Sequence, residues 1–176
     1  MVRPVSDNPI YKMHNMGFSI TWSLISMGID EREKYGFALM SQDILEYLNL
    51  RLGVSKNYED EIIHIICLNN ESNCIYENIR FLANKEPDQS NLNRRKWRAF
   101  LFSRLINDVN CKSADIYDFW ITFNDVLPRP DFYPYNAVAF LSKQENEIIE
   151  LNKKWFVDEM QSIIAEDKYL ISLYAI

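Results

Sequence analysis

Hydrophobic residues recur along most of this chain at intervals of three and four, the spacing that places them on one face of an α-helix. The clearest case is the segment 91–109, where Trp97, Leu101, Leu105 and Val109 stand four residues apart. A stripe of this kind is buried when the helix packs against its neighbours. We therefore expect a long helix over 91–109.

Other segments show the same periodicity and are preceded by residues that cap helices, because short polar side chains accept hydrogen bonds from a helix's first N–H groups. The predicted helices cover residues 22–27, 31–40, 42–52, 59–68, 73–85, 91–109, 114–127, 134–141 and 143–167. The expected caps are Thr21, Asp30, Ser41, Ser72, Ser113 and Ser142. Gly28 is expected to close the first helix. The run Ile62–Leu68 also fits a buried strand, so it stays open between helix and strand.

The expected core follows from these stripes. Its members are Ile44, Leu45, Leu48, Leu52, Ile75, Ile79, Leu82, Ile148, Leu151 and Met160, with the tryptophans Trp22, Trp97, Trp120 and Trp155. Residues 1–17 are polar and contain prolines, so we expect an extended lead-in there. The apolar tail 169–176 is expected to pack back onto the body.

Composition favours helices joined by short loops. Only 4 glycines and 6 prolines occur in 176 residues, which is few for a sandwich or barrel with many tight turns. Hydrophobic residues make up 48% of the chain, enough to form a core. No internal repeat and no Gly/Ser-rich linker is visible. We therefore predict an all-α, single-domain bundle of about seven to nine helices over residues 1–176.

The chain is acidic, with a formal net charge of -6. Such a protein is repelled by phosphate backbones and attracted to basic proteins, so nucleic acid is a poor candidate partner. No apolar run reaches the roughly 18 residues that suggest a membrane span, so no membrane partner is expected. The first 17 residues lack the apolar stretch of a signal peptide, and we expect a cytoplasmic protein.

Residues suited to catalysis or metal binding are sparse. His64 lies among isoleucines, as a partly buried core histidine would, and the only other histidine is His14. His64, Cys67 and Cys74 would supply three ligands where zinc usually has four, and Cys111 completes no second pair. Glycine-rich phosphate loops and a glycine-flanked serine are absent. We therefore expect no enzyme, no metal and no cofactor.

One basic cluster, Arg94-Arg95-Lys96-Trp97-Arg98, could grip phosphates and stack a base. The alternative is an amphipathic helix whose polar face carries the basic residues while Trp97 turns into the core. The acidity of the surrounding chain favours this second interpretation.

A family resemblance rests on a short set of motifs. They are Thr21-Trp22 with Gly28, then Trp97-Arg98, and finally the corner Asp131-Phe132-Tyr133-Pro134 leading into residues 137–141. In these features the chain resembles a bacterial helical family long catalogued as a domain of unknown function. Its members occur among immunity proteins of contact-dependent growth inhibition and related polymorphic toxin systems. The resemblance implies a cytoplasmic protein that binds and neutralises a cognate toxin domain, and it supplies no catalytic residues.

The charge fits this implication, since an acidic inhibitor can block the basic substrate groove of a nuclease toxin in a one-to-one complex. The candidate contact residues are Asp30, Glu31, Glu33, Glu59, Asp60, Glu61, Asp115, Asp118 and Asp125. Acidic side chains also favour helix starts, so a purely structural role is open for each. Two other functions stay open: a helical scaffold or regulator, and an enzyme with a site built from His64 and carboxylates.

Overall fold

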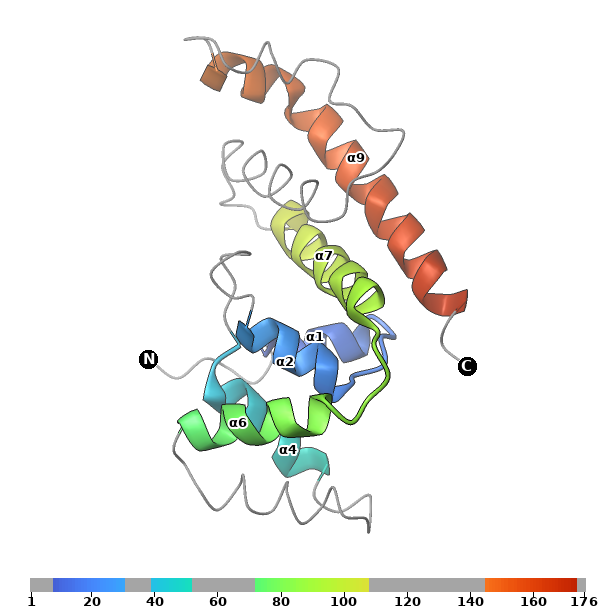
Figure 1. Ribbon diagram of the computed structural model, residues 1–176. Coiled ribbons are helices and arrows are strands. Elements are labelled where there is room, and N and C mark those ends of the chain that lie inside the picture. Colours follow the sequence, from blue (N-terminus) through green and yellow to red (C-terminus); the bar gives the residue numbers. More distant parts are fainter. Residues whose placement is uncertain (1–7, 31–38, 52–71, 108–144, 174–176) are drawn as a thin grey trace. The chain divides into compact units, whose positions relative to one another are not determined.

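Figure 1 shows a computed structural model that describes residues 8–30, 39–51, 72–107 and 145–173. All regular structure in these ranges is helical, which confirms the all-α class for this part of the chain. The helices are α1 (Pro9–Asn15), α2 (Trp22–Asp30), α4 (Ser41–Arg51), α6 (Ser72–Ala83), α7 (Ser90–Asn107) and α9 (Glu145–Leu173). The chain divides into two compact units, Met1–Asn93 and Arg94–Ile176. The predicted helix count and single domain concern the whole chain and stay predictions.

Several predicted elements lie outside the described residues. They are the helices over 59–68, 114–127 and 134–141, most of the helix over 31–40, the alternative strand at Ile62–Leu68 and the proline corner.

The expected extended lead-in is wrong for residues 9–15, which form α1. Asn8 caps this helix, because its side-chain Oδ1 accepts a hydrogen bond of 2.9 Å from the backbone N–H of Ile10. Pro9 fits the first helical position, where no N–H partner is needed and its fixed φ suits a helix. Ile10 and Met13 are then buried on one face.

Gly17 ends α1 by adopting a φ of 85°, a conformation that favours glycine. Its N–H donates to the carbonyl of His14 at 2.9 Å, and the N–H of Phe18 donates to the carbonyl of Met13 at 3.1 Å. This pair of bonds is the Schellman motif, which satisfies carbonyls that the helix end leaves unpaired. Phe18 is buried directly after the turn.

Unit 1 packs α2 against α6, α1 against α4, and α4 against α6. Polar bonds fix α1 on α4: the side-chain amide of Asn8 donates to the carbonyl of Asp43 at 2.8 Å, and the Tyr11 hydroxyl donates to the carbonyl of Glu46 at 2.9 Å. Burial, followed by the charges of Glu46 and Tyr47, raises the pKa of Tyr11 above its ordinary value. Tyr11 therefore keeps its donor proton at neutral pH.

The hydrophobic stripes of unit 1 are confirmed where they are described. Ile44 and Leu48 of α4 and Ile75, Ile79 and Leu82 of α6 are all buried. Leu45 is half-buried, and Leu52 lies outside the described residues.

Three helix boundaries differ from the prediction. Gly28 does not close α2, which continues to Asp30. Ser41 and Ser72 are the first helical residues of α4 and α6, one position later than a cap. At α4 the buried Asp43 reaches back instead, and its Oδ2 accepts from the N–H of Met40 at 2.9 Å. A carboxylate in the first turn is also favoured by the helix dipole.

Unit 2 contains a buried ion-pair network between α7 and α9. Asp167 of α9 is fully buried and accepts from two arginines of α7. Arg98 binds it in a fork, with Nε 2.8 Å from Oδ2 and Nη2 2.7 Å from Oδ1, and Nη1 of Arg95 lies 2.9 Å from Oδ1. Bidentate, charge-assisted hydrogen bonds of this kind fix geometry as well as adding energy.

The network corrects half of the prediction for the basic cluster. Trp97 is buried as expected and meets Phe100 edge to face, with ring centroids 6.0 Å apart. The basic residues do not all share the polar face, however, because Lys96 and Arg98 are buried as well. The sequence pattern could not indicate this, since the buried carboxylate that binds Arg98 lies 69 residues away.

The helix predicted over 143–167 is α9, which begins at Glu145 and continues to Leu173. The described part of the tail continues this helix, with Ile171 buried, as packing onto the body requires, and with Tyr169 and Leu173 exposed. Met160 is buried as predicted. The side chains of the other three predicted core residues of this helix, Ile148, Leu151 and Trp155, lie outside the described ones.

We predict that Asp167→Ala lowers the free energy of unfolding by about 3–5 kcal/mol, because it leaves the buried Arg98 without its carboxylate. The matched control is Asp30→Ala, which removes the half-exposed partner of Arg80, bound by two N–H groups on one oxygen, and should cost about 1 kcal/mol or less. Urea unfolding followed by tryptophan fluorescence measures both. Equal losses in the two variants would contradict a burial-dependent effect.

Candidate functional site

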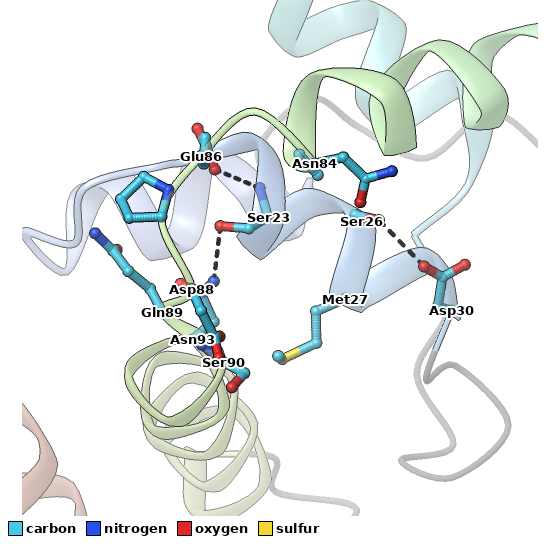
Figure 2. A pocket seen from close by; sticks show the side chains of 12 residues that line it. Ser23, Ser26, Met27, Asp30, Asn84, Glu86, Asp88, Gln89, Ser90 and Asn93 are labelled. Atoms are coloured by element: carbon cyan, nitrogen blue, oxygen red, sulfur yellow. Dashed lines mark hydrogen bonds between the residues drawn. The ribbon is translucent and has the colours of Figure 1, made fainter.

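A pocket of about 380 Å³ lies within unit 1. Figure 2 shows its wall, which combines α2, the connection between α6 and α7, and the first turn of α7. Its polar lining includes Ser23, Ser26, Asp30, Glu86, Asp88 and Asn93. No lysine, arginine or histidine is among the described residues that line it. The pocket is therefore rich in hydrogen-bond acceptors and carries negative charge.

Glu86 builds one side of the pocket by capping α2 from a distant point in the sequence. Its Oε1 accepts from the backbone N–H of Trp22 at 2.9 Å, and its Oε2 accepts from that of Ser23 at 2.7 Å. The next N–H, of Leu24, donates to Oγ1 of Thr21 at 3.1 Å, which confirms Thr21 as a cap. Three N–H groups that the helix start leaves unpaired are thus satisfied, and the carboxylate lies where the helix dipole favours it.

The connection after α6 brings Glu86 into place. α6 ends at Ala83, and the N–H groups of Lys85 and Glu86 donate to carbonyls three residues back, at 3.1 Å each. These tight turns satisfy the last carbonyls of the helix. Pro87 follows and cannot continue a helix. The helix predicted over 73–85 therefore ends two residues earlier than expected, at Ala83.

Asn93, at the start of α7, joins this helix to α2 through a hydrogen bond. It is fully buried, and its Nδ2 donates to Oγ of Ser23 at 3.0 Å, as drawn in Figure 2. Ser23 Oγ lies 3.1 Å from Oγ1 of Thr21, so the side chains of Asn93, Ser23 and Thr21 form a continuous chain of hydrogen bonds. The Oδ1 of Asn93 has no hydrogen-bond partner among the residues that the structure describes. A buried acceptor left in this state is unusual and unfavourable.

Asp30 is the one predicted contact residue that the structure describes, and it lines the pocket. Its Oδ1 accepts from Nε and Nη2 of Arg80 at 2.9 and 2.7 Å, and its Oδ2 accepts from Oγ of Ser26 at 3.1 Å. Both charged side chains are about half-exposed, so this pair leaves its carboxylate close to solvent. Most of the helix that Asp30 is predicted to cap lies outside the described residues.

The other eight predicted contact residues lie outside the described ranges. They are Glu31, Glu33, Glu59, Asp60, Glu61, Asp115, Asp118 and Asp125.

Sequence reasoning missed Glu86, Asp88 and Asn93. The one local signal was the polar stretch around Pro87, which reads as an ordinary loop. Glu86 and Asn93 take part in the pocket through hydrogen bonds to α2, more than 60 residues away, and no spacing in the sequence indicates those bonds.

The arrangement suits binding better than acid–base chemistry. Both oxygens of Glu86 are already engaged by backbone N–H groups. His14 is exposed on α1, and it does not line this pocket; His64 lies outside the described residues. Among the described side chains, no group of histidine, cysteine and carboxylate residues could hold a metal ion. In the same part of the chain, no helix has the length and apolarity needed to cross a membrane.

Comparison with known proteins gives one match. The model of a family described as "Uncharacterized protein conserved in bacteria (DUF2247)" matches residues 10–165, which includes every residue of the pocket. No curated protein and no solved structure matches the chain.

We predict that Glu86→Ala lowers the free energy of unfolding by about 1.5–3 kcal/mol, since two charge-assisted hydrogen bonds at the start of α2 are lost. The control is Glu77→Ala, an exposed glutamate on the neighbouring helix α6, which should change it by less than about 0.5 kcal/mol. Chemical denaturation monitored by circular dichroism gives both values. If the two variants are equally stable, Glu86 does not anchor α2.

Proposed function

The chain belongs to the bacterial family DUF2247, and we propose that it is an immunity protein. In this proposal it binds a cognate secreted toxin domain in a one-to-one complex and neutralises it by covering the toxin's basic active-site face. A nuclease is the expected toxin, because an enzyme that acts on a polyanion needs a basic substrate groove. The resemblance of the Thr21-Trp22 and Trp97-Arg98 motifs to immunity proteins of polymorphic toxin systems motivates the proposal.

The observation that carries the proposal is that Lys96 and Arg98 of the basic cluster are buried and that Arg95 is paired. Arg98 is almost fully buried on Asp167, Arg95 binds the same carboxylate, and Lys96 is fully buried. These cations are therefore not arranged on the surface as a phosphate-binding patch. The strongest sequence argument for a nucleic-acid partner is weakened accordingly.

The distribution of buried charge supports an acidic surface. The buried charged residues in the described part of the chain are two cations, Lys96 and Arg98, and two carboxylates, Asp43 and Asp167. Their formal charges cancel, so the net charge of -6 belongs to the remainder of the chain. A negative field of this kind raises the rate at which a basic partner is encountered.

The scaffold alternative gains no support from the described surface. Its exposed large hydrophobic residues are Met40 and Phe81 in unit 1, and Tyr169 and Leu173, which stand four residues apart on α9 of unit 2. Phe81 is also covered by the ammonium of Lys85, 4.3 Å from the ring centre. Two single residues and one pair on a helix do not make the large contiguous apolar patch that indicates a docking surface.

We predict that this protein rescues bacteria that express the variable C-terminal domain of a large secreted protein encoded immediately upstream of its gene. Purified together, the two should form a one-to-one complex. The association rate constant should fall about tenfold or more from low to high salt, because rising ionic strength screens the attraction between opposite charges. Growth assays and stopped-flow binding measure these effects.

An unrelated acidic helical protein of similar net charge is the control, and it should neither rescue growth nor bind. A toxin domain that stays fully active in an excess of the immunity protein, with no complex formed, would overturn the proposal.

A further inference from the structure

The pocket of unit 1 has a chemical character that the proposed function does not use. Three carboxylates line it, those of Asp30, Glu86 and Asp88, and no basic side chain is among its described lining residues. Asp30 is partly neutralised by Arg80, and Glu86 by the start of α2. Asp88 is exposed, and its Oδ1 accepts from the N–H of Ser90 at 2.9 Å.

The unsatisfied oxygen of Asn93 gives this acidic pocket a second, independent indication of a ligand. Asn93 is fully buried in the wall, and its amide nitrogen is already used on Ser23. Its Oδ1 finds no donor within the part of the chain that the structure describes. The Oδ1 of Asn93 can accept a hydrogen bond from a ligand that carries a donor. The surrounding carboxylates favour a ligand that is positively charged.

From these features we propose that the pocket binds a guanidinium group on an alkyl stem. A guanidinium offers five N–H donors in a fixed plane and accepts none, which matches a wall made of acceptors. Carboxylate oxygens that accept one backbone N–H keep further lone pairs for a second donor. Met27, Ala83 and Pro87 line the same pocket and provide apolar surface for the methylene stem. The volume of about 380 Å³ lies at the lower end of the roughly 300–1,000 Å³ typical of ligand pockets.

Two sources can supply such a group: an arginine of a protein partner or a free guanidinium compound. The first deepens the proposed function and rests on it, since a basic toxin face would insert an arginine here. The experiment therefore begins with a small probe that needs no toxin.

The probe is Nα-acetyl-L-arginine amide, titrated into the full chain and followed by amide chemical shifts. Its neutral isostere, Nα-acetyl-L-citrulline amide, is the ligand control. We expect saturable binding of the arginine probe, shifts centred on Ser23 and Asn93, and no saturation with the citrulline probe. Equal binding of the two probes, or shifts that avoid the pocket, would overturn the proposal.

Two variants test the residues that recognise the probe. Asp88→Asn removes the charge of Asp88 while keeping an oxygen for the Ser90 N–H, and it should weaken binding about twofold to fivefold. Glu77→Gln makes the same charge change on the exposed side of α6, outside the pocket, and should leave binding unchanged. Asn93→Ala should weaken it about tenfold, provided that its amide spectrum shows the native fold. Equal effects of Asp88→Asn and Glu77→Gln would mean that only net charge matters, which also overturns the proposal.

The same variants separate the two sources once a toxin is in hand. If Asp88→Asn weakens the toxin complex and Glu77→Gln does not, the guanidinium is an arginine of the toxin. If the probe binds as expected and the complex is unaffected, the pocket takes a free guanidinium compound. A toxin that fails to bind at all overturns the proposed function, whereas the probe titration supports or overturns the pocket by itself.

Discussion

The described part of unit 1 depends on the hydrogen bonds that the first N–H groups of α2 make. A helix start exposes N–H groups that no residue within the helix can accept, and here a single carboxylate, Glu86, takes two of them. The interaction joins α2 to the connection between α6 and α7, and both segments contribute to the wall of the pocket. Ser23 contributes to both sides, since its N–H meets Glu86 and its hydroxyl meets Asn93 of α7. The pocket is thus a consequence of capping one helix with residues far along the chain.

Unit 2 also depends on a carboxylate, but this one is buried and bound by arginine side chains. Asp167 is fully buried and must be matched, because an unpaired charge in the interior is strongly unfavourable. Arg98 and Arg95 supply that match, and the fork of Arg98 admits only a narrow range of positions for α9 along α7. Such a pair adds little net stability relative to a hydrophobic contact, yet breaking it is costly. Its main effect is to fix which residues of the two helices meet.

These two networks mark the boundary of what the sequence could predict. Local patterns were sufficient for Ile75, Ile79 and Leu82, because periodicity alone decides which face of a helix is apolar. They were also sufficient for Thr21, a capping residue whose partner lies three positions away. They failed for α1, where the polar character of the segment outweighed the Asn8-Pro9 signature of a helix start. They could not reach Arg98 and Asp167 or Glu86 and Trp22, since each pair is made by tertiary packing.

This division between local and distant partners also explains what the family motifs do. Thr21 caps α2 and Trp22 is buried with its N–H on Glu86, so this motif serves the start of one helix. Trp97-Arg98 serves the core and the ion pair of unit 2 in the same way. Both motifs are therefore architectural, and neither presents a functional group to a partner. The side chains that line the pocket belong instead to residues that no motif marks, such as Asp88 in the connection between α6 and α7. Motifs that place the fold in a family can be uninformative about the partner, because the groups that hold helices together are withdrawn from the surface that a partner meets.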